Sequence, residues 1–112
     1  MLNLYGIKNC DTVKKARRWL EDHGIYYQFH DFRQDGLDKK LLSSWVDLLG
    51  WESVVNKRST TWRNLTDKEK EISTSTQAVR LLAANPTLIK RPVVQNGKVL
   101  LVGFKESEFK NL

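Results

Sequence analysis

The chain has a single cysteine, two prolines and no long apolar run, and each scarcity excludes a class of protein. One cysteine excludes an intramolecular disulfide and a four-cysteine zinc site, and it suits the reducing cytosol. No apolar segment approaches the roughly 20 residues that a membrane-spanning helix needs. The N-terminus has no basic segment followed by an apolar stretch, as a secretory signal has. We therefore expect a cytoplasmic protein that does not contact a membrane.

What the 112 residues do contain is an ordinary globular composition, 40% hydrophobic and 29% charged. This is enough for one hydrophobic core, so we expect a single domain. The formal net charge is +6, but no run reaches the roughly five or six like charges of a basic tail. The charge pattern favours a solvated surface that attracts small anions over specific nucleic-acid binding.

The N-terminal third has the pattern of a β-α-β unit. Leu2–Tyr5 is typical of a short strand. Apolar residues at helical spacing predict a helix that starts at Asp11 or Thr12, either of which can cap it, and stops at Gly24. Residues 25–32 are rich in aromatic and branched side chains, which predicts a second strand. These two strands should be parallel, because a helix connects them.

The middle of the chain predicts helices. Leu41–Leu49 carries an apolar stripe that Gly50 closes. Thr66–Glu69 and Thr74–Gln77 both fit the capping-box pattern, and the second should open a helix that ends at Asn85-Pro86. We expect a helical segment at about residues 38–85.

Strand signals return near the C-terminus. Pro92–Gln95 and Lys98–Val102 flank Asn96-Gly97, a dipeptide typical of a two-residue hairpin turn of type I′. Residues 104–109 can form a small terminal helix. One α/β topology suits this order: a thioredoxin-like, four-stranded mixed sheet flanked by helices, with a helical insertion between its βαβ and ββα halves.

Cys10 lies where the first strand has ended and the first helix begins. A sulfur there faces unpaired N–H groups and the positive end of the helix dipole, and both favour the thiolate, which is the nucleophile. Lys8, Lys14 and Lys15 add positive charge nearby. A lone cysteine is also common as a small buried hydrophobe, so the residues alone leave both interpretations open.

Three segments resemble one known family. Tyr5–Thr12, followed by a basic helix, resembles the arsenate reductases of glutaredoxin type and their Spx-like regulators. Ile89–Val94 and Leu101–Phe104 resemble the later motifs of that family, in the same order and spacing. Within the family, the chain is most similar to the short YffB-like branch of thiol reductases. The resemblance covers nearly the whole chain.

The resemblance implies a site around Cys10. In such folds the proline before the third strand is cis and faces the catalytic sulfur, which implies a cis Arg91–Pro92 bond and an Arg91 guanidinium near Cys10. A guanidinium can hold an oxyanion or a carboxylate with two hydrogen bonds. No metal site is expected. The residues implied are Cys10 and Arg91 as catalytic, with Lys8, Asn9, Arg58 and Pro92 binding substrate or glutathione.

The chain also departs from the family at identifiable positions. Arsenate reductases surround the cysteine with three arginines, and Arg91 matches one of them. Asn56 stands at the middle position, with Arg58 two residues later as in Spx-like members. The last position falls in residues 98–103, which contain no arginine. Spx regulators use two cysteines three positions apart, but here the second position is Val13, so any disulfide must form with another molecule.

These features predict a thiol-dependent reductase with a single nucleophilic cysteine and no bound cofactor. Its reductant would be glutathione or another small thiol, whose carboxylates suit the basic residues, and glutaredoxin is a further candidate partner. Two alternatives stay open. One is an Spx-like regulator that binds the transcription machinery, and the other is arsenate reduction itself.

Overall fold

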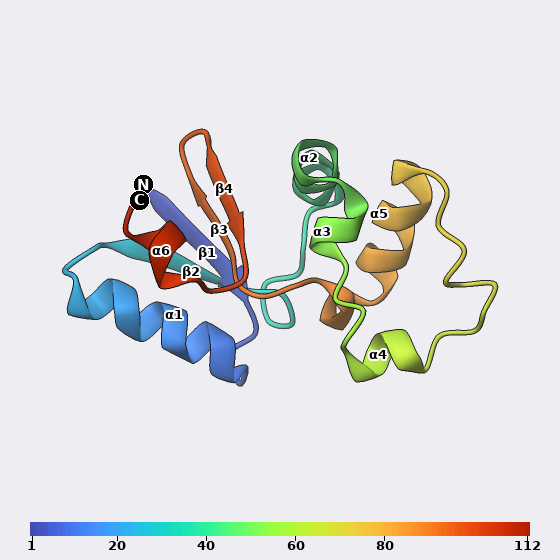
Figure 1. The fold of residues 1–112 in the computed structure, drawn as a ribbon, viewed down its shortest axis with the longest axis horizontal. Coiled ribbons are helices and arrows are strands. Elements are labelled where there is room, and N and C mark those ends of the chain that lie inside the picture. The colour runs from blue at the N-terminus through green and yellow to red at the C-terminus, as the bar shows by residue number, and fades with distance from the viewer. The chain divides into compact units, whose positions relative to one another are not determined.

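The computed structural model describes all 112 residues, which form two compact units. The first unit consists of residues 1–36 and 91–112, and the second of residues 37–90 (Figure 1). The helical segment expected at about residues 38–85 falls within the second unit. No helix has both the length and the apolar character needed to cross a bilayer.

The first unit is built on a four-stranded sheet. Its strand order is β2-β1-β3-β4, with β1 parallel to β2 and antiparallel to β3, and with β3 and β4 forming a hairpin. The predicted parallel pair, the hairpin and the mixed sheet are therefore confirmed. The elements of this unit are β1 (Leu2–Gly6), α1 (Asp11–Asp22), β2 (Tyr27–Asp31), β3 (Val93–Asn96), β4 (Val99–Val102) and α6 (Glu106–Phe109).

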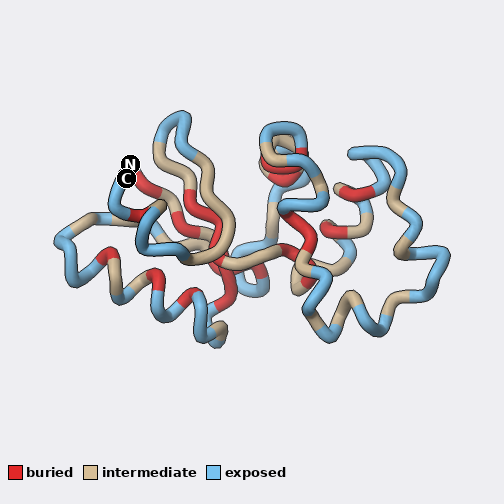
Figure 2. Tube along the Cα trace, viewed as in Figure 1, coloured by how far each residue is buried: buried red, intermediate tan, exposed pale blue.

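The alternation of buried and partly exposed side chains along β1 decides which face of the sheet the helices cover. Leu2 and Leu4 are buried, whereas Asn3 and Tyr5 between and after them are only partly so, because successive strand residues point to opposite faces. Buried positions recur at helical spacing along α1, as Figure 2 shows. Helices α1 and α6 thus cover the same face, through a core of Leu2, Leu4, Val13, Ala16, Leu20, Val94 and Phe109.

The second unit contains only helices and their connections. Its helices α2 and α5 pack against each other, and an isolated bridge joins Val55 to Ile89. Helix α2 starts before its apolar stripe, because the Asp38 side chain accepts a hydrogen bond from the N–H of Lys40 (2.9 Å). The elements are α2 (Lys39–Leu49), α3 (Trp51–Val54), α4 (Thr60–Arg63), α5 (Ser75–Ala84) and the short 3₁₀ helix η1 (Pro86–Leu88).

One of the two predicted capping boxes does not open a helix. The Thr66 N–H donates to Oε1 of Glu69 (2.9 Å) and the Glu69 N–H donates to Oγ1 of Thr66 (3.1 Å). The backbone N–H of Thr66, and after it the Thr66 hydroxyl, hold the pKa of the Glu69 carboxyl group below its usual value. Residues 67–70 nevertheless form only a turn, because no apolar stripe comes after them that could be buried. The Thr74 box, which precedes the stripe of α5, does open a helix.

The hairpin turn lies one residue later than predicted, so the type I′ prediction for Asn96-Gly97 is wrong. Asn96 pairs with Val99, which makes Gly97 and Lys98 the central residues. A type I′ turn needs positive φ at both, but only Gly97, with φ of 60°, has it. A positive φ followed by a negative one matches a type II′ turn, which places glycine first.

A close approach between Gly6 and Val13 fixes where α1 begins relative to β1. A Cβ atom added to Gly6 would lie 2.7 Å from Cγ2 of Val13. Val13 is fully buried, and its branched side chain has little freedom to turn away. Only glycine therefore lets the end of β1 lie this close to the first turn of α1.

We expect Gly6→Ala to lower the free energy of unfolding by about 1–3 kcal/mol through overpacking. Urea denaturation of both proteins measures this cost. In a Val13→Ala background the same change should cost less, because the colliding methyl group is gone. An equal cost in the two backgrounds would contradict this explanation.

Candidate functional site

Four strand ends meet at one edge of the sheet. Strands β1 and β2 run parallel and end there at Gly6 and Asp31. Strand β3 is antiparallel to β1 and starts there at Val93, while β4 ends there at Val102. The loop of residues 7–10 leaves from this same edge, which is therefore the candidate functional site.

Cys10 is the N-cap residue of α1. The Ile7 carbonyl accepts a hydrogen bond from the Cys10 N–H (3.2 Å), which closes a turn, and the Cys10 carbonyl accepts the first helical bond from Lys14 (2.9 Å). The prediction that Asp11 or Thr12 caps the helix is wrong, since both lie inside it. The turn already leaves Cys10 extended, with φ of −95° and ψ of 126°, so the helix begins directly after it.

The Cys10 side chain is partly exposed and makes no capping hydrogen bond. Part of it rests against the core beneath α1. The first N–H groups of a helix have no intrahelical partners, and this end of the helix dipole attracts negative charge. The sulfur thus belongs to the end of α1 that suits an anionic nucleophile and has a route to solvent.

Arg91 and Pro92 flank the start of β3. Their peptide bond is cis, which confirms that prediction, and Pro92 is buried while Arg91 is partly exposed. Tyr5 pairs with Val93, so the antiparallel register continues with Pro92 beside Gly6. The next pair along brings Arg91 toward the loop that carries the cysteine. A guanidinium close to the sulfur stays a prediction.

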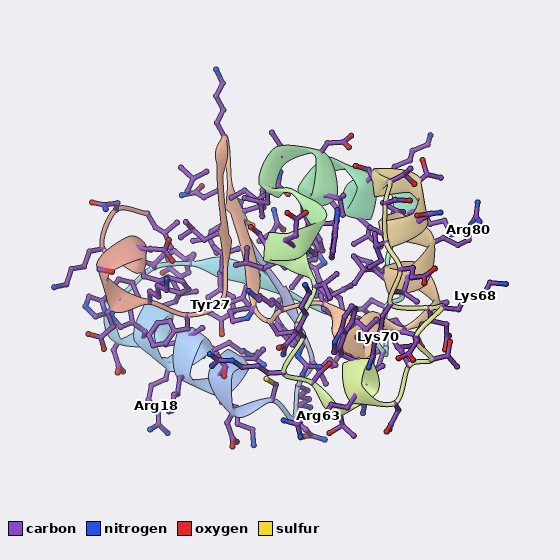
Figure 3. The ribbon with its side chains drawn as sticks, turned by 45° about the vertical axis from the view of Figure 1, so that its right-hand side comes forward. Arg18, Tyr27, Arg63, Lys68, Lys70 and Arg80 are labelled. Carbon is purple, nitrogen blue, oxygen red and sulfur yellow. The ribbon has the colours of Figure 1, made fainter.

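Lys8 and Asn9 are the two central residues of the turn before Cys10, and both side chains are exposed. On the outer side of α1, Lys14 and Lys15 line a shallow hollow together with Asp11 and Arg18. Figure 3 shows Arg18 projecting away from the helix into solvent. The loop and the first turns of α1 therefore present positive charge in the part of the chain that carries the cysteine.

Arg58 belongs to the second unit, where it is exposed between α3 and α4. Its N–H donates to Oδ1 of Asn56 (3.1 Å). The Asn56 carbonyl accepts from both the N–H (3.2 Å) and the hydroxyl (2.8 Å) of Ser59. Asn56 therefore shapes the turn that presents Arg58, and a role for Arg58 in binding stays a prediction.

Asp31 is the residue of this edge that the sequence analysis missed. It is the chain's buried charged residue, only 4% exposed. Its Oδ2 accepts the N–H of Lys8 (3.0 Å), and its Oδ1 accepts those of Arg33 (2.7 Å) and Gln34 (3.2 Å). An aspartate at a strand end before a polar, glycine-containing segment is typical of an Asx turn, and this signal could have identified it.

The charge state of Asp31 is set by two opposing effects. Burial by itself raises the pKa of the carboxyl group. The backbone hydrogen bonds from Arg33, Lys8 and Gln34, with the positive charge of Arg33, outweigh burial and hold the pKa below its usual value. Asp31 is therefore ionised at neutral pH, and its negative charge is satisfied by donors from two separate segments.

Acid should weaken the fold through Asp31. Because its folded-state pKa lies below the unfolded value of about 3.9, its stabilisation is fully present above that value and is lost as the pH falls through the folded-state pKa. We expect Asp31→Asn to lower the free energy of unfolding at pH 7 by about 1.5–3 kcal/mol. The difference in the free energy of unfolding between wild type and Asp31→Asn should therefore shrink progressively as the pH falls below about 5.

Urea denaturation at each pH measures that difference. Asp35→Asn is the matched control, because Asp35 is exposed and an asparagine oxygen can still accept the Asp31 N–H that Asp35 accepts at 3.1 Å. A difference for Asp31→Asn that stays constant into acid would contradict the assigned role.

Known proteins are similar to this chain in sequence and in fold. Residues 5–112 match the ArsC family. A Haemophilus influenzae protein described as uncharacterized is 54% identical over 110 residues, which cover 97% of this chain and 96% of that protein. The global transcriptional regulator Spx of Streptococcus mutans is 30% identical over 114 residues, which cover 98% of this chain and 81% of the regulator.

Solved structures agree with these sequence relatives. A YFFB protein superposes with a TM-score of 0.95 at 42% identity, covering 99% of this chain and 97% of its own. An arsenate reductase (ArsC) related protein from Brucella melitensis gives a TM-score of 0.79 at 43% identity, covering 98% and 92%. The four-stranded mixed sheet flanked by helices is thus the thioredoxin-like fold of these proteins. Over nearly its whole length, this chain belongs to the ArsC family.

Proposed function

We propose that the protein is a cytoplasmic thiol oxidoreductase in which Cys10 is the nucleophile and glutathione is the reductant. One observation carries this proposal: Cys10 is the N-cap of α1, partly exposed, with a side chain that makes no capping hydrogen bond. A structural cysteine would be sealed in the core, as its neighbours Val13 and Ala16 are. Membership of the ArsC family supports the same assignment.

The chemistry needs two exchange steps, because the chain has no second cysteine. In the first, the Cys10 thiolate attacks the glutathione sulfur of a mixed disulfide, and the substrate thiolate leaves and takes a proton from solvent. In the second, a glutathione thiolate attacks that sulfur, which releases Cys10 and forms oxidised glutathione. Two electrons pass from glutathione to the substrate, and the enzyme returns to its starting state.

Binding of glutathione is assigned to the positive groups around Cys10. Glutathione carries two carboxylates, and a guanidinium such as that of Arg91 can hold one with paired hydrogen bonds. The exposed side chains of Lys8 and Asn9 can add an ammonium group and an amide donor. Contacts of glutathione with Pro92 and with Arg58 belong to this proposal by family resemblance alone.

A regulatory role is the second candidate, because Spx proteins are 30% identical to this chain over nearly its full length. An Spx-like adaptor would bind the transcription machinery with or without a reactive sulfur. The discriminating measurement is capture of RNA polymerase by the wild type and by Cys10→Ser. Capture by both proteins, together with absence of thiol exchange in both, would favour the adaptor.

We expect Cys10→Ser to abolish thiol exchange with a glutathionylated peptide while keeping the fold. Serine is a better N-cap than cysteine, so the free energy of unfolding should stay equal or rise by up to about 1 kcal/mol. Stopped-flow exchange rates and urea denaturation measure the two effects. Arsenate, supplied with glutathione and glutaredoxin, is tested as a second substrate of both proteins. Equal exchange rates in mutant and wild type would overturn the proposal.

We expect Arg91→Ala to raise the KM for glutathione by about tenfold or more, because a charge-assisted hydrogen bond to a carboxylate is lost. Lys98→Ala is the matched control. It removes the same charge from the exposed hairpin turn, at the other end of β3 and β4. Steady-state kinetics with varied glutathione measure both. A similar KM in the two variants would show that overall charge, and not Arg91, sets the affinity.

A further inference from the structure

A buried carboxylate joins the cysteine loop to the end of β2. The Lys8 N–H, two residues before Cys10, donates to Oδ2 of Asp31 at 3.0 Å. The other carboxylate oxygen is used within its own segment, where it accepts the N–H groups of Arg33 and Gln34. One side chain thus shapes the turn after β2 with one oxygen and holds the cysteine loop with the other.

Ile7 at the start of the loop is buried and Cys10 at its end packs against the core, but Lys8 and Asn9 between them have few other restraints. A backbone hydrogen bond from Cys10 to Ile7 closes the turn, and the side chains of Lys8 and Asn9 lie in solvent. Hydrogen bonds to an ionised, buried acceptor are among the strongest in a protein. The bond to Asp31 is therefore the side-chain hydrogen bond that holds the middle of the loop, between the buried Ile7 and the Cys10 at the start of α1.

We propose that Asp31 is a positioning residue for the Cys10 nucleophile, acting through the N–H of Lys8. This inference rests on the proposed thiol chemistry and deepens it. With the bond in place, Cys10 stays at the N-cap, at the end of α1 whose first N–H groups have no intrahelical partner. With the bond broken, the loop can move and the sulfur leaves that position for part of the time.

The direction in which Asp31→Asn changes the reactivity of Cys10 separates positioning from simple electrostatics. Asp31 carries a negative charge, and a negative charge near a thiol disfavours its thiolate. If charge alone mattered, Asp31→Asn would make Cys10 more reactive. If the bond to Lys8 matters, Asp31→Asn makes Cys10 less reactive. The asparagine oxygen can still accept from Arg33 and Gln34, but its amide then turns a donor toward the Lys8 N–H.

A second pair of variants removes the donor instead of the acceptor. Lys8 is the first central residue of the turn that Ile7 and Cys10 close. No residue of this chain other than glycine has a positive φ, so the turn is of type I, which accepts proline at that position. Lys8→Pro deletes the N–H and the charge, whereas Lys8→Ala deletes only the charge. The ratio of the reaction rates of these two variants isolates the contribution of the Lys8 N–H.

The test measures the rate of Cys10 alkylation by iodoacetamide and the rate of exchange with a glutathionylated peptide, both on the full chain at pH 7. We expect alkylation to be about three- to tenfold slower in Asp31→Asn than in wild type, and in Lys8→Pro than in Lys8→Ala. Exchange should fall by about tenfold or more, because it also needs an aligned sulfur. Asp35→Ala, which removes a different bond from the same turn, should stay within about twofold of wild type.

Equal or faster alkylation in Asp31→Asn, or equal rates in the two Lys8 variants, would overturn the proposal. Thermal unfolding and circular dichroism show whether each variant is folded at the assay temperature. Should Asp31→Asn fail to fold, the two Lys8 variants decide the question, since neither touches the carboxylate. If wild type shows no exchange at all, the proposed function fails, and the alkylation rates still decide whether Asp31 positions the sulfur.

Discussion

The hydrogen bond between the Asp31 carboxylate and the Lys8 N–H is the constraint on which the candidate site depends. Burying a charge without partners would cost several kcal/mol, so Asp31 is tolerable only while its three N–H donors stay in place. The ends of β1 and β2 are therefore held together by this carboxylate in addition to the sheet, and the cysteine loop lies between that anchor and α1.

The fold supplies one thiol and no partner for it. Enzymes with two nearby cysteines close an internal disulfide, so their specificity lies mostly in the first attack. In the proposed function the second thiol comes from solution, so binding of that thiol belongs to the proposed mechanism. The proposal gives the positive groups of the loop, of α1 and of Arg91 a role in binding that thiol. Asn56, which by resemblance stands where arsenate reductases carry arginine, shapes the turn before Ser59.

The features that periodicity determines could be predicted from the sequence. Apolar residues at helical spacing located α1, α2 and α5, and the Pro92–Val102 pattern located the hairpin. Features set by contacts between distant segments could not be predicted in this way. The Thr66 box formed but had no apolar face to bury, and the register of β3 with β4, not the Asn96-Gly97 dipeptide, chose the turn. The Asx-turn signal could have identified Asp31 as a turn residue, but its bond to Lys8, 23 residues away, could not be predicted from the sequence.

The position of the second cysteine in Spx regulators bears on the proposed single-thiol chemistry. By resemblance that position is Val13, and Val13 is fully buried against Gly6 at the start of α1. A branched apolar side chain there fills the space between helix and strand, where a smaller thiol would leave a void. The residue that would complete a redox switch is thus part of the packing that holds the helix start. The same helix turn that presents Cys10 therefore carries a packing residue in place of an internal redox partner.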